Sequence, residues 1–271
     1  MTCNVEIASG IHALRWFDLT SEYKKCLVNK LNSHKFQTLW SYLPLAVDSC
    51  GGHLLKSVLH AKYLVNTDDI KLVVLPRNQM SACTSVTVGI GNDTSAERQL
   101  QMYLPPTKFY GVDPFLESAK AFAQYGDYFT TAISATGGPI NASVLVGKNY
   151  TFKTIPSEPL WSFIKNQLRL TKVDFLFLDV EGTEYDIIPQ FKNRGPFDEN
   201  DIVICQLNVE LHGPLSNYTI SEMRFARLIR RFFHSSPYLP VWIPAPVHHH
   251  RVFLINWKDP YCIRKFFQDW C

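Results

Sequence analysis

The sequence predicts an α/β fold, with a mostly parallel sheet, helices on both of its faces, and an antiparallel hairpin at the C-terminal end. Three observations predict it. From residue 84 onward, short β-rich runs alternate with amphipathic stretches, as in successive βαβ units. Residues 173–178 are apolar apart from Asp174, which is typical of a strand buried on both faces. The last two predicted strands are joined by a short turn without a crossover helix, so they must pair antiparallel.

Residues 1–80 predict a mostly helical lead-in that packs on the domain formed by residues 81–271. Two segments, 21–31 and 36–43, carry apolar residues at helical spacing. Pro44 is expected to end the second helix, because proline cannot donate the next backbone hydrogen bond.

Within the domain, each element follows from local periodicity and from the residues that break it. An edge hairpin is expected over 142–153, after the break at Gly137-Gly138-Pro139. Thr219 and Glu222 form a capping box that opens a helix running to about Phe233. The other expected helices are 94–103, 114–125 and 160–170, and the expected strands are 84–90, 108–112, 128–133, 173–178, 201–207, 238–243 and 251–257.

The composition is that of a folded protein without a preference for polyanions. Hydrophobic residues make up 46% of the 271 residues, and the formal net charge is +3. The basic residues are scattered, so we expect no nucleic-acid partner. The longest apolar runs end at roughly eight residues, whereas a membrane helix needs about 20, so no membrane-spanning segment is expected. The N-terminus lacks the apolar core of a signal peptide.

The cysteines predict free thiols in a reducing compartment. There are seven, an odd number, and none forms a CxxC pair. Sequons at Asn92, Asn141, Asn149 and Asn217 are a weak signal in the other direction. We therefore expect a cytoplasmic protein, with the secretory pathway as the alternative. The sequence makes no prediction of the oligomeric state.

A glycine-containing loop follows the first strand of the domain. Gly89 and Gly91 stand between a strand and a helix, where backbone can approach a ligand closely and helix N–H groups are available. Asp93 replaces the third glycine of a nucleotide loop, and it could equally cap the helix. Asp113 ends the next strand, where an acid accepts hydrogen bonds from ribose hydroxyls or caps the helix before Pro114. Together the loop and Asp113 predict adenosine binding.

Two later strands end in polar residues that carry the strongest functional signal. Asp179 and Glu181 emerge together from a buried strand, where charges are costly unless they meet a ligand, a metal ion or hydrogen-bond donors. The segment QLNVELHG ends the following strand and is expected to turn its polar side chains, including Glu210 and His212, toward the same cleft. His212 titrates near neutrality and is a candidate base, although a lone histidine is as often structural. The tract 248–250 is expected to be a solvated rim.

The sequence resembles the FkbM-type methyltransferases, in the branch that is expanded in nematodes. The resemblance rests on VDFLFLDVEGTEYDIIP with its leading helix, on TSVTVGIGNDTSAERQL and KFYGVDP, and on VICQLNVELHG, and it covers about residues 82–257. It implies a Rossmann-like class I methyltransferase domain with a seven-stranded, mostly parallel sheet and S-adenosylmethionine as the cofactor.

The resemblance also implies where the cofactor lies. Gly89 and Gly91 would line its methionine part, with Asp93 beside them in the loop. Asp113 would hold the ribose hydroxyls. Ile133 and Ser134 would lie near the adenine.

On the acceptor side, the resemblance implies a hydroxyl of a small molecule or glycan as the group that is methylated. Asp179 would face the cofactor and the reaction centre, with Glu181, Glu210 and His212 toward the acceptor. Our hypothesis is that His212 or Glu181 removes the acceptor proton, while Asp179 orients the cofactor. We assign no metal ligand, although Asp179, Glu181 and His212 are of types that suit Mg²⁺ or a transition metal.

Three positions depart from the family pattern. Thr87 stands where an acid is usual, Asp93 replaces a glycine, and Phe177 replaces a basic residue. These departures leave two alternatives open. One is a binding protein that kept the scaffold without catalysis. The other is a metal-dependent transferase that uses Asp179 and Glu181. A phosphatase of the haloacid dehalogenase type is disfavoured, because the later motifs of that class are absent from this sequence.

Overall fold

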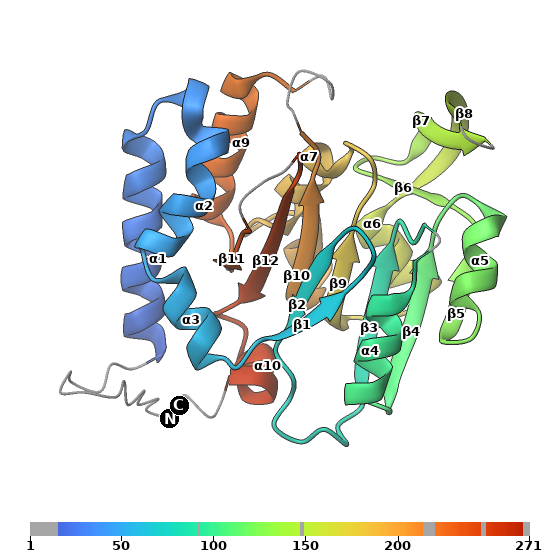
Figure 1. Cartoon of the computed structure of the whole chain (residues 1–271), viewed down its shortest axis with the longest axis horizontal. Helices are drawn as coiled ribbons and strands as arrows, with labels where there is room; N and C mark the ends of the chain where they lie inside the picture. Colours follow the sequence, from blue (N-terminus) through green and yellow to red (C-terminus); the bar gives the residue numbers. More distant parts are fainter. Residues whose placement is uncertain (1–15, 92, 147–148, 214–219, 245–247, 268–271) are drawn as a thin grey trace.

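A seven-stranded sheet in the order β11-β12-β10-β9-β3-β4-β5 organises the chain (Figure 1). The computed structural model describes residues 16–91, 93–146, 149–213, 220–244 and 248–267. Neighbouring strands pair in parallel, except that β12 is antiparallel to both β10 and β11. The α/β class, the seven-stranded sheet and the terminal hairpin are therefore confirmed. The strands are β3 (Cys83–Val88), β4 (Thr107–Val112), β5 (Gly126–Phe129), β9 (Lys172–Leu178), β10 (Val203–Leu211), β11 (Tyr238–Trp242) and β12 (His250–Asn256).

The central strand β9 is buried over all but its first residue, as its apolar sequence predicts. Its one charged residue, Asp174, is 2% exposed. Lys265 Nζ lies 2.9 Å from one Asp174 carboxylate oxygen, and Thr84 N donates to the same oxygen at 2.8 Å. The buried charge is thus neutralised by a lysine from the C-terminal helical segment.

The strand order reverses between β3 and β9, because β4 and β5 lie on one side of this pair and β10, β12 and β11 on the other. In open α/β sheets, ligands bind outside the carboxyl ends of the strands at such a reversal. The loops after β3, β4, β9 and β10 therefore surround the place where a ligand is expected.

Helices cover the sheet on both faces (Figure 1). Helix α9 begins after Ser221, whose hydroxyl accepts a hydrogen bond from Arg224 N. The predicted capping box is therefore displaced, and its Thr219 lies outside the described residues. The helical elements after β3 are α4 (Ser95–Tyr103), α5 (Leu116–Phe122), α6 (Leu160–Ser162), η2 (Phe163–Gln167), α7 (Glu184–Ile187), η3 (Ile188–Phe191), α8 (Pro196–Glu199), α9 (Glu222–Ser235), α10 (Pro260–Cys262) and η5 (Ile263–Phe267). In the described part of the chain, no helix combines the length and apolar character needed to cross a bilayer.

The N-terminal part forms helices and one hairpin, with α1 packed against α2 and α9 (Figure 1). Trp16 Nε1 donates to Trp257 O at 3.1 Å, and Tyr23 OH donates to Pro240 O at 2.5 Å. These contacts tie α1 to the C-terminal strands, while the division of the chain at residue 80 stays a prediction. The elements are α1 (Trp16–Ser33), η1 (Phe36–Thr38), α2 (Leu39–Ser49), α3 (Gly52–Val58), β1 (Lys62–Val65) and β2 (Ile70–Val73).

Pro44 lies inside α2 and does not end it, so that prediction is wrong. A proline removes the N–H that would bond to the carbonyl four residues earlier, here that of Trp40. His250 Nε2 lies 2.9 Å from this Trp40 oxygen, and the two rings are 4.0 Å apart. The first residue of β12 thus replaces the donor that α2 lacks.

The strand predicted at 128–133 is also wrong, because two strands in different sheets cover it. β5 belongs to the main sheet, whereas β6 (Ala132–Ser134) pairs in parallel with β8 (Asn149–Pro159). β8 pairs antiparallel with β7 (Gly138–Val146), which confirms the predicted hairpin and completes a three-stranded sheet. Ile133 and Ser134 therefore belong to this second sheet.

The prediction of free thiols is wrong for four cysteines, because sequence spacing does not show which cysteines the fold brings together. One disulfide joins Cys26 to Cys50, and a second joins Cys205 to Cys262. Cys83 is a buried free thiol, and residues 3 and 271 lie outside the described part. Among the sequons, Asn141 is exposed; residues 92 and 217 lie outside the description, as does the side chain of residue 149.

Candidate functional site

The loop after β3 requires glycine at one position and leaves space at another. Both Gly89 and Gly91 have positive φ, 76° and 60°. A Cβ on Gly89 would lie 1.6 Å from Asp179 O, so any side chain would collide with the chain leaving β9. A Cβ on Gly91 would meet nothing within 4 Å, so the loop is open at that residue. The loop therefore combines close packing with room for a ligand.

The Asp113 carboxylate holds this loop in place. Oδ2 accepts hydrogen bonds from Ile90 N at 2.9 Å and from Gly91 N at 3.3 Å, and Oδ1 accepts one from Phe115 N at 2.9 Å. Asp113 is 6% exposed. A carboxylate has about four acceptor positions, so these three bonds leave capacity for one more donor. Both sequence interpretations, a helix cap and a ligand acceptor, remain compatible with this geometry.

Asp93 joins the loop to the β1–β2 turn. Its carboxylate accepts hydrogen bonds from Thr67 N at 2.6 Å and from Ser95 N at 2.9 Å. Partial burial raises the pKa of Asp93, but these hydrogen bonds outweigh it and hold the pKa well below the usual range. Each oxygen thus has a backbone partner, and a direct contact of Asp93 with a cofactor stays a prediction.

Charges from elsewhere in the chain lie beside two of the unusual positions. Thr87 Oγ1 donates a 2.7 Å hydrogen bond to the buried carboxylate of Glu97 on α4, whose pKa is raised by burial. Lys71 Nζ, from β2, lies 5.9 Å from the Phe177 ring centroid. Burial lowers the pKa of Lys71, but the charge of Asp69 and those of Glu97 and Asp179 outweigh it and raise the pKa. An acid and a base therefore lie near two of the three positions that were singled out as departures from the resembled pattern.

Glu184 is the residue of this site to which the sequence analysis gave no role. It lies at the start of α7 and is fully buried. Oε1 accepts from Val180 N at 2.8 Å and lies 2.9 Å from His212 Nδ1, while Oε2 accepts from Gly182 N at 2.9 Å. The sequence feature that points to this role is the position of Glu184 just after a turn, where the N–H groups of Val180 and Gly182 need acceptors.

His212 stands between Glu184 and two more carboxylates. Its Nε2 lies 3.6 Å from Asp179 Oδ1 and 3.5 Å from Glu181 Oε2. Burial lowers the pKa of His212, but the hydrogen bond and charge of Glu184, with the charges of Asp179 and Glu181, raise it to about 9. In the absence of a bound cation, these neighbours favour the imidazolium form of His212 at neutral pH.

Asp179 and Glu181 differ in their surroundings. Burial and the charge of Glu210 raise the pKa of Asp179 well above its usual value. Asp179 Oδ1 is buried, and no described residue donates a hydrogen bond to it. The Glu181 side chain is half exposed, and its backbone has a φ of 54°, a conformation that is uncommon outside glycine. Such strain is typical of functional sites.

The expectation that all polar residues of QLNVELHG face one cleft is wrong for two of them. Gln206 exchanges two hydrogen bonds with the Val74 backbone, and Asn208 exchanges two with the Leu72 backbone. Their amides therefore hold β2 and the residue after it against β10. Further along β10, Glu210 lies 3.2 Å from Arg251 Nε through Oε2, and burial raises its pKa.

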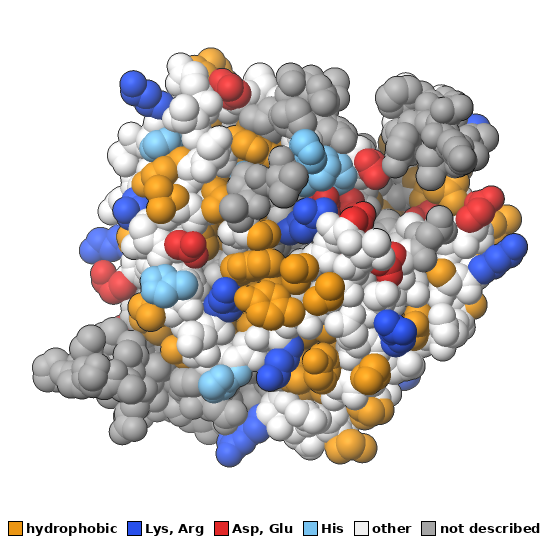
Figure 2. Space-filling view, viewed as in Figure 1, with side chains coloured by type: hydrophobic (Ala, Val, Ile, Leu, Met, Phe, Trp, Pro, Cys, Tyr) orange, Lys and Arg blue, Asp and Glu red, His pale blue; other side chains and the backbone are white. Residues whose placement is uncertain are grey.

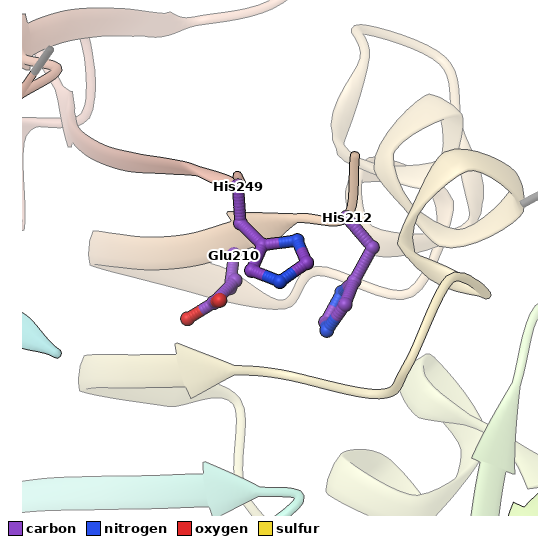
Figure 3. A group of neighbouring side chains, drawn as sticks. All are labelled: Glu210, His212 and His249. Carbon is purple, nitrogen blue, oxygen red and sulfur yellow. The ribbon is translucent and has the colours of Figure 1, made fainter. Parts of the chain in front are cut away.

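The three histidines of the tract have different surroundings, so the predicted solvated rim describes only His248, which is exposed. His250 is buried against Trp40. His249 accepts a hydrogen bond from Gly213 N at 3.0 Å through Nδ1, and its ring centroid lies 4.6 Å from that of His212 (Figure 3). Burial, and next the charge of His212, lower the pKa of His249 to about 4.

The strand ends bring Gly89, Gly91, Asp113, Asp179 and His212 to one edge of the sheet, with Glu181, Glu184 and Glu210 beside them. Figure 2 shows histidine, acidic and basic side chains gathered above an apolar area on this side of the molecule. The exposed apolar residues of the β1–β2 hairpin are Tyr63, Val65 and Ile70. Ile133 and Ser134, in contrast, are held in the second sheet, where Ser134 Oγ lies 2.8 Å from Ser157 Oγ.

A groove of about 820 Å³ lies along α9, apart from these strand ends. Its basic residues include Arg224, which pairs with Asp186 at 2.6 Å, and Arg230, which donates to Leu31 O and His34 O. Two of the arginines are thus engaged in holding α7 and α1 against α9.

Comparison with known proteins adds a family and distant structural likenesses. The family model described as Methyltransferase FkbM domain matches residues 49–235. A Caenorhabditis elegans protein, Uncharacterized protein C28H8.7, is 25% identical over 182 residues, which are 67% of this chain and 55% of that protein. The chain thus spans about half the length of that relative.

Among solved structures, similarity is found to a fibrillarin/Nop5p complex, with 10% identity, a TM-score of 0.39, and coverage of 64% of this chain and 72% of that chain. M. capricolum TrmK, in complex with S-adenosyl-homocysteine, is 13% identical with a TM-score of 0.37, and the match covers 66% of this chain and 64% of that one. These TM-scores are too low for the structural similarities to support a conclusion about this chain.

Proposed function

This chain belongs to the FkbM methyltransferase domain family, and we propose that it transfers a methyl group from S-adenosylmethionine to a hydroxyl of a small-molecule or sugar acceptor. The proposal depends on one observation: a glycine loop and a cluster of charged side chains lie together where the strand order reverses. The glycine loop is held by Asp113, and Glu184, His212 and Glu181 stand on the neighbouring strand ends.

The residues present fit this cofactor. The open position at Gly91 offers space beside the loop, and the Asp113 carboxylate has capacity for a hydroxyl donor. When bound, the cofactor supplies an electrophilic methyl group on a sulfonium that is a good leaving group. The chain then has to place the acceptor oxygen in line with that methyl and to accept the acceptor proton.

We assign proton removal to Glu181. The sequence left His212 and Glu181 as alternatives, and the raised pKa of His212 means that it already carries a proton near neutral pH. Glu181 is half exposed and can reach a bound acceptor, while the His212 imidazolium 3.5 Å away holds its carboxylate in position. Asp179, whose Oδ1 lies 3.6 Å from the same Nε2, would orient the cofactor.

The charges near Thr87 and Phe177 support an active enzyme over a scaffold that has lost catalysis. Glu97 is buried and accepts a hydrogen bond from Thr87, and the mostly buried Lys71 is paired with Asp69. An acid and a base thus stand near the two positions at which the sequence departs from the family pattern, where an active site would use them.

The test is S-adenosylhomocysteine release by the purified protein across a panel of hydroxylated small molecules and sugars. With an acceptor found, Glu181→Gln is expected to slow turnover by about 10²–10⁴-fold, because the acceptor proton then has no base. Glu117→Gln, at an exposed acid on α5, is the control and should turn over normally. Normal turnover by Glu181→Gln would remove its assigned role, and cofactor binding without turnover on any acceptor would favour the non-catalytic alternative.

A further inference from the structure

Glu210 near the end of β10, His212 just after it, and His249 just before β12 converge. One ligand atom from each lies within 4.8 Å of those from the other two. Figure 3 shows the His249 ring between the side chains of Glu210 and His212. Metal–ligand bonds to histidine nitrogen and carboxylate oxygen are about 2.0–2.2 Å, so small side-chain rotations would bring all three onto one ion.

Asp179 supplies an independent observation on the β9 side. Its Oδ1 is buried, has no hydrogen-bond donor among the described residues, and lies 3.6 Å from His212 Nε2. Glu181 Oε2 lies 3.5 Å from the same nitrogen. A buried carboxylate oxygen without a donor is costly to leave charged, and a cation beside it removes that cost. The distances match neighbouring ligand atoms around one metal ion.

Glu184 orients the central histidine in the way that metal sites use. A carboxylate that already accepts from Val180 N and Gly182 N can only accept from His212 as well, so the proton between them belongs to Nδ1. The other ring nitrogen, Nε2, then faces the carboxylates of the site. Histidine ligands of metals are commonly held by such a carboxylate behind the ring.

We propose that Glu210, His212 and His249 bind a divalent transition-metal ion, with Asp179 as a further ligand from β9. Two imidazoles with carboxylates suit Zn²⁺, Mn²⁺ or Fe²⁺ better than Mg²⁺. Glu210 keeps Oε2 on Arg251 and offers its other oxygen. Such an ion takes the place of the proton on His212 Nε2, so the imidazolium that faces Glu181 and Asp179 is the metal-free form.

The experiment is calorimetric titration of chelator-treated protein, without a polyhistidine tag, with Zn²⁺ and separately with Mn²⁺ and Mg²⁺. We expect one equivalent of Zn²⁺ or Mn²⁺ to bind, and more tightly than Mg²⁺. His249→Ala is expected to weaken binding at least about 10-fold, and Glu184→Gln about 10–100-fold through the lost support of His212. His248→Ala is the matched control, because it removes an exposed histidine from the same tract.

Either of two results would overturn the proposal: no stoichiometric binding of Zn²⁺ or Mn²⁺ to the wild-type protein, or equal weakening by His248→Ala and His249→Ala. His249 is only partly buried, so its substitution is expected to leave the fold intact, as a thermal melt verifies. The metal titration needs no cofactor. If the wild-type protein binds S-adenosylmethionine but no metal, only this inference is overturned. If it binds a metal but not S-adenosylmethionine, only the proposed function is overturned.

Discussion

The buried carboxylate of Glu184 decides the charge and direction of His212. Its two oxygens accept from the turn after β9 as well as from the His212 ring, so one side chain joins the ends of β9 and β10. The sequence singles out the acids Asp179 and Glu181 by their place after a buried strand. It does not indicate that a third acid, one turn later, points inward.

Glu184→Gln tests this role, because it removes the negative charge while keeping the shape of the side chain. The pKa of His212, raised to about 9 chiefly by Glu184 against the effect of burial, should fall toward or below its ordinary value. As the pH rises, His212 would then lose its proton at a pH closer to neutrality than in the wild type. Titration of His212 by NMR, in chelator-treated protein, measures the shift.

Asp186→Asn is the control for this titration, since Asp186 is an exposed acid two residues further along α7. It should leave the His212 titration almost unchanged. A His212 pKa that stays near 9 in Glu184→Gln would contradict the account.

At the scale of elements, Pro44 and His250 form one unit. The helix α2 lacks the N–H that would bond to Trp40 O, and His250 Nε2 meets that oxygen at 2.9 Å. The buried position of His250 and the tolerance of a proline inside α2 therefore have the same cause, the hydrogen bond to Trp40 O.

His250→Ala is expected to cost about 1–3 kcal/mol of the free energy of unfolding, because the Trp40 carbonyl loses its donor. Pro44→Ala restores an N–H within α2, so it should recover part of that loss. Urea unfolding of both single variants and the double variant measures the coupling. We expect a coupling of about 1 kcal/mol, whereas additivity within about 0.3 kcal/mol would show that the two residues act separately.

The sequence predicts elements well where the local pattern decides the structure. β3, β4, β9 and the terminal hairpin follow from apolar runs and turn residues, and the parallel order follows from their alternation with helices. It fails where a distant partner decides. Pro44 is tolerated because His250 supplies the missing donor. The amides of Gln206 and Asn208 donate to the backbone of Val74, just after β2, and of Leu72, within β2.

The candidate site shows the same division. Residues after strands, such as Gly89, Asp113 and Asp179, could be selected because the carboxyl ends of parallel strands meet at one edge. Glu97 and Lys71 could not, because they reach the site from α4 and β2, whose packing no local pattern encodes.

At the scale of the whole molecule, two disulfides close segments separated by 24 and 57 residues. Such pairs are typical of oxidising compartments, so we propose the secretory pathway, the alternative to the expected cytoplasm. Removing Cys205 and Cys262 together by alanine substitution should lower the free energy of unfolding by about 4 kcal/mol, and removing Cys26 and Cys50 by about 3 kcal/mol.

Non-reducing peptide mapping by mass spectrometry checks both pairs directly, and urea unfolding measures their energies. Cys83 is the internal control, because a buried thiol should alkylate only after denaturation. Alkylation of Cys205 or Cys26 in the native, unreduced protein would contradict these pairings.

In the proposed function, the loop held by Asp113 binds the methyl donor. Calorimetric titration with S-adenosylmethionine and S-adenosylhomocysteine tests it most directly, with Asp113→Ala, the milder Asp113→Asn, and Asp127→Ala at an exposed acid of β5 as the control. We predict micromolar binding of both ligands to the wild type and to Asp127→Ala, and loss or strong weakening in the two Asp113 variants. Absence of binding to the wild type, or equal binding by every variant, would contradict the assignment of this loop as the cofactor site.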